Sequence, residues 1–162
     1  MRRLFFGLGV VLIGASSAQE VGPADVFNQL KSLVGAWEGK TETGRLLRVD
    51  YKLSAGETVL VETWTLGAGR ESMTLYHMDN QDLVATHYCP IGNQPRLRLK
   101  LPVSVDRFIF DFVSATNLPD ASFAHQQMFE IKILSKDSLW RSETYVEKGE
   151  KSIEAVTYSR QR

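Results

Sequence analysis

The feature that most constrains this fold is an apolar–polar alternation of period two, which runs through almost the whole chain from Trp37 onward. Between residues 107 and 112, for example, three phenylalanines alternate with Arg107, Ile109 and Asp111. Such alternation is typical of β-strands with one buried face. Strands are predicted at ten places: 37–43, 46–54, 57–66, 70–78, 83–89, 96–101, 106–113, 127–134, 138–147 and 151–159.

The segments between these strands are short, and several have turn chemistry, such as Ala55-Gly56, Asp79-Asn80 and Lys148-Gly149. Strands joined so closely must be antiparallel neighbours, because a parallel return needs a long crossover. We therefore predict an all-β fold: a roughly ten-stranded antiparallel up-and-down β-barrel, closed so that no strand edge is exposed. A two-sheet sandwich is the alternative. The longest irregular stretch, residues 114–126, is placed to fold over a barrel mouth.

A short helix precedes the strands. Apolar residues recur at helical spacing between Val26 and Val34, and Asp25 is placed to favour the helix N-terminus. Gly35 follows, where a left-handed stop costs glycine little. A helix this short is not stable alone, so it must lie against an apolar surface.

The first eighteen residues are typical of an export signal. Arg2 and Arg3 precede an apolar run over residues 4–13, and the small residues Ser16-Ser17-Ala18 follow. The run is too short to span a membrane. We predict a signal peptide at 1–18, a single barrel domain at 19–162, and a periplasmic or secreted protein; a retained N-terminal anchor is the alternative.

Composition excludes some partners. The sequence has 19 basic and 19 acidic residues, and residues 1–18 contain two arginines and no acid, so the remainder has a formal charge of −2. This gives no electrostatic reason to bind nucleic acid or an anionic membrane. The single cysteine, Cys89, rules out an intramolecular disulfide, and the oligomeric state stays open.

Trp37 is the predicted structural residue. In Gly35-Ala36-Trp37 it begins the first strand directly after the helix, where an indole can plug one barrel end and donate its N–H to a backbone carbonyl. Together with the helix and the ten-strand meander, this Gly-x-Trp pattern resembles the calycin superfamily of lipocalins, fatty-acid-binding proteins and nitrobindins.

A more specific resemblance comes from three segments, 73–79, 86–96 and 110–118, and spans most of residues 27–158. They look like hallmark stretches of a family of uncharacterised bacterial lipocalin-like proteins. That family is expected to have His-x-His after the long loop, whereas this chain has His125-Gln126-Gln127. The resemblance implies the fold and brings no activity with it.

His87 is the main candidate for a ligand contact. His87 and Cys89 are two apart on a strand, so they point the same way. A three-residue turn in the preceding hairpin would place His77 on that face, whereas a two-residue turn would align His77 with Val84. The apolar match favours the three-residue turn, which would put His77, His87 and Cys89 on one wall.

Imidazole and thiolate ligands suit zinc or copper, and one imidazole suits haem iron. Nitrobindin-like barrels bind haem through a histidine, so the resemblance keeps haem as an alternative. The ligand set for this alternative is His87, His77, Cys89 and His125, and these residues lack the tight spacing of metal-binding motifs. We predict no cofactor or metal, with the histidines as ordinary wall residues and Cys89 as a small buried group.

Other candidate ligand contacts are polar or amphipathic. Asn93 and Arg96 lie in and after a loop, where Arg96 suits a carboxylate or phosphate; Tyr88 and Trp140 offer surface for a pocket. Each has a structural alternative. Arg96 fits a solvated outer face, Asn93 fits a turn, and the aromatic residues fit a barrel core.

The leading functional hypothesis is an exported protein that binds a small, partly apolar ligand in the barrel lumen. A haem or metal protein using His87 is one alternative, and an enzyme of unknown reaction acting within the barrel is another. The sequence has no Gly-x-Ser-x-Gly elbow, no phosphate-binding glycine loop and no His-Glu-x-x-His motif, so a non-enzyme is favoured. Glu62, Glu130 and Glu143 lie on predicted strands, and surface positions are their default.

Overall fold

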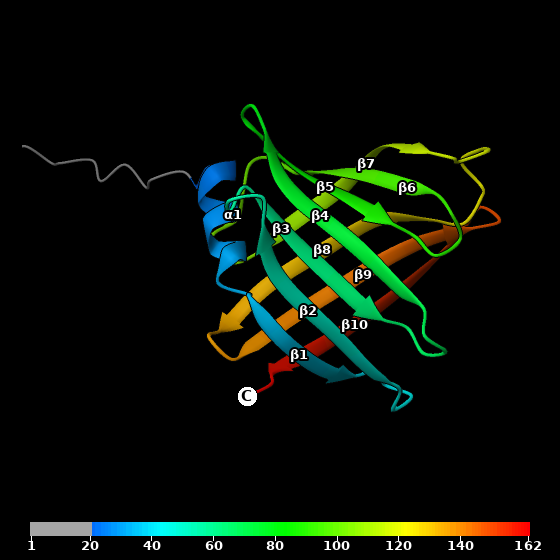
Figure 1. Cartoon of the computed structure of the whole chain (residues 1–162). Helices are drawn as coiled ribbons and strands as arrows, with labels where there is room; N and C mark the ends of the chain where they lie inside the picture. Colours follow the sequence, from blue (N-terminus) through cyan, green and yellow to red (C-terminus); the bar gives the residue numbers. More distant parts are fainter. Residues whose placement is uncertain (1–20) are drawn as a thin grey trace, which may run out of the picture.

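A computed structural model describes residues 21–162 as ten antiparallel strands that close into one barrel, with a single short helix at one end (Figure 1). This confirms the predicted fold class and excludes the sandwich. The predicted signal peptide at 1–18 lies outside the described residues. The elements are α1 (Pro23–Lys31), β1 (Gly35–Lys40), β2 (Leu46–Ser54), β3 (Val59–Thr65), β4 (Glu71–Asp79), β5 (Asp82–Tyr88), β6 (Gln94–Leu99), β7 (Phe108–Thr116), β8 (His125–Ser135), β9 (Ser138–Glu147) and β10 (Glu150–Arg160).

The barrel closes where β1 pairs with β10, the first strand with the last. Trp37 is opposite Arg160, and Gly39 is opposite Tyr158. A Cβ atom at Gly39 would lie 2.7 Å from the carbonyl oxygen of Thr157. Glycine at this position therefore permits the close backbone approach that the closing pair requires.

The helix α1 covers one end of the barrel, next to β4 and β5. At its start the Asp25 carboxylate accepts the Gly22 N–H at 3.0 Å, as expected for an acid in the first turn. The helix ends at Lys31, earlier than the apolar pattern predicts, because Val34 is exposed and Leu33 is already in a tight turn. Its buried residues are Val26, Phe27 and Leu30.

The β4–β5 hairpin has a two-residue turn, so the favoured three-residue register is wrong. Asp79 pairs with Asp82 across Asn80-Gln81, and Asn80 has φ 55°. Asparagine tolerates this left-handed conformation, which tight hairpin turns require. As a result His77 lies opposite Val84, and Thr74 lies opposite His87.

The segment between β7 and β8 is shorter than predicted, since both strands extend into it and leave residues 117–124. Asn93 donates to the Ala124 carbonyl oxygen at 2.7 Å, and Asn117 donates to the Gly92 carbonyl oxygen at 3.2 Å. These bonds fasten the loop to the β5–β6 turn.

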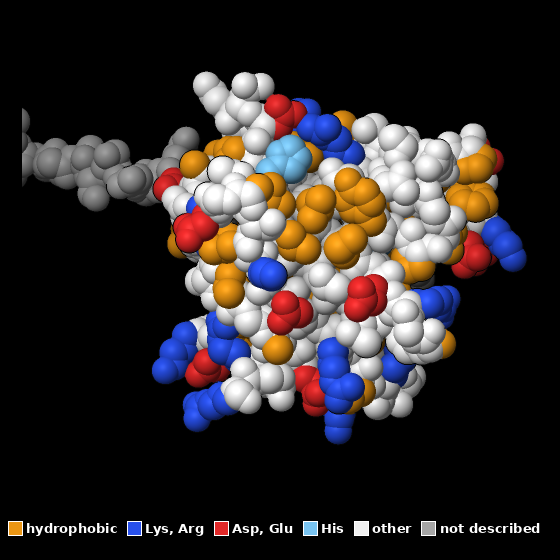
Figure 2. All heavy atoms as spheres, in the orientation of Figure 1, with side chains coloured by type: hydrophobic (Ala, Val, Ile, Leu, Met, Phe, Trp, Pro, Cys, Tyr) orange, Lys and Arg blue, Asp and Glu red, His pale blue; other side chains and the backbone are white. Residues whose placement is uncertain are grey.

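The outer face of the barrel also has apolar surface. Hydrophobic side chains gather around β3 and β4 in Figure 2. In register, Val59 on β3 lies opposite the half-buried His77 on β4, and His77 lies opposite Val84 on β5, which is only 1% exposed. Apolar surface on an outer face is a common feature of protein–protein contact sites.

Candidate functional site

The lumen near α1 is filled by aromatic side chains. The rings of Phe110 and Phe129 stack with centroids 4.6 Å apart, and Tyr76 meets both edge-on at 5.7 and 5.9 Å. All three are fully buried. This half of the barrel is therefore a packed core.

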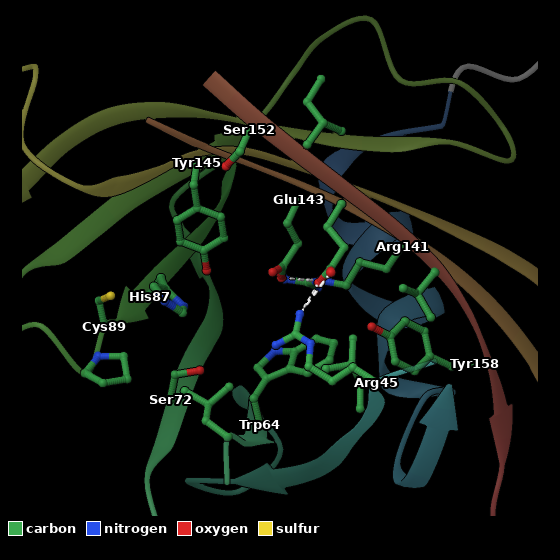
Figure 3. A pocket seen from close by; sticks show the side chains of 16 residues that line it. Arg45, Trp64, Ser72, His87, Cys89, Arg141, Glu143, Tyr145, Ser152 and Tyr158 are labelled. Carbon is green, nitrogen blue, oxygen red and sulfur yellow. Dashed lines mark hydrogen bonds and ion pairs between the residues drawn. The ribbon is translucent and has the colours of Figure 1, made fainter. Parts of the chain in front are cut away.

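The opposite half of the lumen holds a cavity of about 530 Å³. Its wall comes from β2 to β5, from β9 and β10, and from the adjoining turns (Figure 3). A cavity of this size is within the range of small-molecule sites. The lining residues are Arg45, Leu47, Trp64, Leu66, Ser72, His87, Cys89, Pro90, Arg141, Glu143, Tyr145, Ser152, Ile153, Glu154, Val156 and Tyr158.

A buried ion pair separates the two halves. Nη1 of Arg141, on β9, lies 2.7 Å from Oε2 of Glu62, on β3, and the two side chains are 1% and 0% exposed. Tyr76 donates its hydroxyl to Oε2 of Glu62 at 2.6 Å, and Trp64 donates its indole N–H to Oε1 at 2.7 Å. These hydrogen bonds offset part of the cost of burying the two charges, although Arg141 Nη2 is a buried donor without a hydrogen-bond partner among the described residues.

Glu143 is the second carboxylate beside Arg141. Its Oε1 accepts from Arg141 Nε at 2.9 Å and from Gln126 Nε2 at 3.4 Å. Its side chain keeps 24% exposure and lines the cavity. Burial raises the pKa of the Glu143 carboxyl, and repulsion from Glu62 acts in the same direction while Arg141 opposes both.

His87 projects from β5 into the same cavity wall. Its Nδ1 lies 3.1 Å from Thr74 Oγ1, and its ring meets Tyr145 edge-on at 6.4 Å. Burial lowers the pKa of His87 to about 4, so the imidazole is neutral at pH 7. Within the part of the chain that the structure describes, Nε2 has no protein hydrogen-bond partner.

Cys89 lines the cavity beside His87, as the two-residue spacing predicts, and Figure 3 shows both on the same side as Tyr145. Burial raises the pKa of the Cys89 thiol, which therefore stays protonated at neutral pH. Among residues 21–162, no group of three or more His, Cys, Asp or Glu side chains is placed to hold a metal ion.

Arg45 and Glu154 form an ion pair at the cavity mouth. Nη2 of Arg45 lies 2.8 Å from Oε2 of Glu154 and links the β1–β2 turn to β10. Both side chains are about half exposed, so this pair contributes little to stability. It does neutralise both charges at the entrance.

Three predicted ligand contacts lie on the outer face and do not line the cavity. Because the β4–β5 hairpin has a two-residue turn, His77 points outward, and its Nδ1 lies 3.2 Å from the Met78 carbonyl oxygen. Arg96 pairs with Asp79 at 2.6 Å, which is the solvated arrangement. Tyr88 is 41% exposed and shares an open outer hollow of about 370 Å³ with Arg96.

The remaining predicted residues are also outside the cavity. Trp140 stacks beneath the Lys132 ammonium at 4.7 Å from the ring centroid, and Asn93 is a buried loop anchor. His125 is buried between the Phe123 carbonyl oxygen and Gln127 Oε1, at 2.7 and 3.0 Å. Trp37 is buried in the core and donates its indole N–H to the Leu33 carbonyl oxygen at 2.7 Å.

Sequence reasoning missed Arg141 and did not separate the three glutamates. Glu62 and Glu143 point inward, whereas Glu130 pairs with Arg107 at 2.6 Å outside the lumen. A signal was present: Arg141 and Glu143 continue the alternation that starts at the apolar Leu139, so they share its buried face.

Comparison with known proteins adds little to this geometry. No known family model matches the chain, and no curated protein matches it. One solved structure similar to it is a protein of unknown function from the DUF3598 family of Nostoc punctiforme, with 15% sequence identity and a TM-score of 0.45. The match covers 82% of this chain and 49% of that chain, so this chain spans about half the length of that neighbour.

Proposed function

We propose that this protein binds a small, partly apolar molecule in the open half of its barrel. The observation that carries the proposal is a cavity of about 530 Å³, which the buried Arg141–Glu62 ion pair separates from the packed half. A barrel that had evolved only for stability would be expected to fill this space, since cavities weaken a core.

Apolar and polar residues of the cavity wall have different roles in binding. Leu47, Trp64 and Val156 supply apolar surface for the body of the ligand, which provides most of the affinity. His87 Nε2 and the Tyr145 hydroxyl supply polar groups that fix its orientation. Tyr145 stays protonated, because burial raises its pKa well above the usual value.

A fluorescence titration with the neutral dye aminoanthracene tests the proposal. Ser72 faces the cavity from β4, whereas its neighbour Glu71 is exposed. Ser72→Leu should weaken dye binding at least about tenfold by filling space, and Glu71→Leu should leave it unchanged. Failure of the wild-type protein to bind the dye, or equal binding by both variants, contradicts the proposal.

A haem-binding role is the second candidate, and the state of His87 favours it. The imidazole is neutral, Nδ1 is held by Thr74 and Nε2 is without a protein partner, which is the arrangement of many metal-ligating histidines. His87 would hold the iron from β5. A haemin titration that gives a Soret band, lost in His87→Ala and kept in His77→Ala, would support it, and a colourless protein that does not titrate with haemin would exclude it.

We also propose that the chain is exported, with residues 1–18 removed as a signal peptide, and that the barrel is a member of the calycin superfamily. The N-terminal charge and apolar run support export. Among residues 21–162, no helix is both long and apolar enough to cross a membrane. Mass spectrometry of the protein from the periplasm or medium should give a chain that starts at Gln19; an intact N-terminus in the cytoplasmic fraction would contradict export.

A further inference from the structure

The charges around the cavity do not balance, and the imbalance points to one class of ligand. Two carboxylates, Glu62 and Glu143, face the single guanidinium of Arg141. The entrance pair of Arg45 and Glu154 is neutral as a unit. The interior wall therefore has an excess of one negative charge when both carboxylates are ionised.

The free oxygen of this cluster is on the cavity side. Glu62 is fully buried, and its two oxygens accept from Trp64, Tyr76 and Arg141. In Glu143 the donors of Arg141 and Gln126 both go to Oε1. Oε2 has no donor among the described residues, and the side chain remains partly exposed to the cavity.

The positive groups are less accessible than this oxygen. Arg141 Nη2 is fully buried and has no hydrogen-bond partner among the described residues, and the guanidinium carbon lies 4.4 Å from the centroid of the Phe129 ring. An anion in the cavity cannot reach Nη2 without moving the side chain. A ligand could reach Arg45 at the entrance, but Arg45 Nη2 already donates to both carboxylate oxygens of Glu154, at 2.9 and 2.8 Å.

The rest of the wall also suits a cation. Trp64 and Tyr158 meet edge-on at 5.5 Å, the guanidinium carbon of Arg141 already lies 5.3 Å from the Trp64 ring centroid, and Tyr145 lies across the cavity (Figure 3). Aromatic faces attract organic cations, more strongly where water is excluded. His87 adds no positive charge at neutral pH, and its 2%-exposed side chain offers an unpartnered Nε2.

We infer that the cavity selects an organic amine, whose ammonium pairs with Glu143 Oε2 while its apolar body lies against Trp64 and Tyr158. This rests on the proposed binding function and adds the charge of the ligand. It makes Glu143 the specificity-determining residue of the site.

Displacement of aminoanthracene by three matched naphthalene compounds tests the inference: the methylamine, the carboxylate and the neutral methanol. The amine should bind at least about tenfold more tightly than the other two, because a charged hydrogen bond in a desolvated site is worth about a factor of ten or more. Glu143→Gln keeps the Oε1 acceptor for Arg141 and should remove about tenfold of the amine's affinity. It should leave the alcohol's affinity within about twofold.

Glu147→Gln is the matched control, since Glu147 lies on the same strand, is exposed and is outside the cavity wall. It should change none of the three affinities, and circular dichroism should show that both variants are folded. If the carboxylate or the alcohol binds as tightly as the amine, or if Glu143→Gln keeps the amine's affinity, charge selection is wrong. If aminoanthracene does not bind at all, the proposed binding function itself fails.

Discussion

The two halves of this barrel use the same strands in opposite ways. Along β9, the inward side chains run from Leu139 through Arg141 and Glu143 to Tyr145, and along β5 from Leu83 through Ala85 to His87. On these two strands the inward residues near α1 are apolar, whereas those at the far end are polar and line the cavity. Strand geometry decides only which residues face inward, and side-chain volume and charge decide what the lumen does.

The Arg141–Glu62 pair lies at the boundary between the halves. It is anchored to the packed side by Tyr76 and to the cavity side by Glu143. Because each partner is held by a different strand, the pair also links β3 to β9 across the lumen. The packed half and this ion pair stabilise the barrel, so the other half of the lumen can contain a cavity.

The largest expected effect is the loss of an aromatic ring from the packed half. Phe129→Ala should lower the free energy of unfolding by about 4 kcal/mol, because it removes a fully buried ring and leaves a void. Ser72→Ala in the open half should change it by less than about 0.5 kcal/mol. Urea unfolding measures both free energies. Equal losses in the two variants would show that the two halves do not differ in packing.

Breaking the boundary pair should have the next largest effect. Arg141→Met should cost about 3 kcal/mol, because the Glu62 carboxylate is left buried without its counter-charge. The double variant Glu62→Gln/Arg141→Met should be more stable than Arg141→Met alone. If the two changes are simply additive in thermal or urea unfolding, the pair is not the boundary element described.

The cavity wall should make stability depend on pH. An unfolded histidine takes up a proton near pH 6.5, whereas folded His87 does so only near pH 4. Between these values the unfolded state binds more protons, so the free energy of unfolding should fall by about 2 to 3 kcal/mol as the pH is lowered from 6.5 to 4.

His87→Gln isolates this effect, because the other titrating groups, including Glu143, remain in both proteins. The difference in unfolding free energy between wild type and variant should change over this pH range and be flat above it. A difference that is constant from pH 4 to pH 7 would show that His87 is solvated.

The smallest effect is expected at the closed end. Trp37→Phe keeps an aromatic plug but removes the donor to the buried Leu33 carbonyl, which should cost about 1 to 2 kcal/mol. Dye binding in the open half should not change. A variant that loses dye binding as well would show that the two halves are coupled.

The fold was predictable from the sequence, and the site was so only in part. Strand number, the antiparallel meander and the positions of Trp37, His87 and Cys89 follow from period-two alternation, which is a local signal. The position of His77 depends on a single turn residue, because one step in register moves a whole strand's side chains to the other face. The pairing of Glu62 with Arg141 joins residues 79 positions apart, and no local pattern specifies which strands meet across a lumen.

Arg96 and Tyr88 are residues that the sequence wrongly favours as ligand contacts. Both have chemistry that suits a ligand, and both lie on the outer face, where Arg96 pairs with Asp79. Residue type alone therefore favours Arg96 and Tyr88 over Glu143, because the surface is the default position of a glutamate. Direction of the side chain, not its chemistry, separates the two groups.

A crystal structure of the protein grown with naphthalene methylamine tests the central claim most directly. The naphthalene ring is expected against Trp64 and Tyr158 on the cavity side, with the amine near Glu143 and the packed half unchanged around Phe110 and Phe129. A far end of the lumen filled by the protein's own side chains, with no ligand inside, would contradict it.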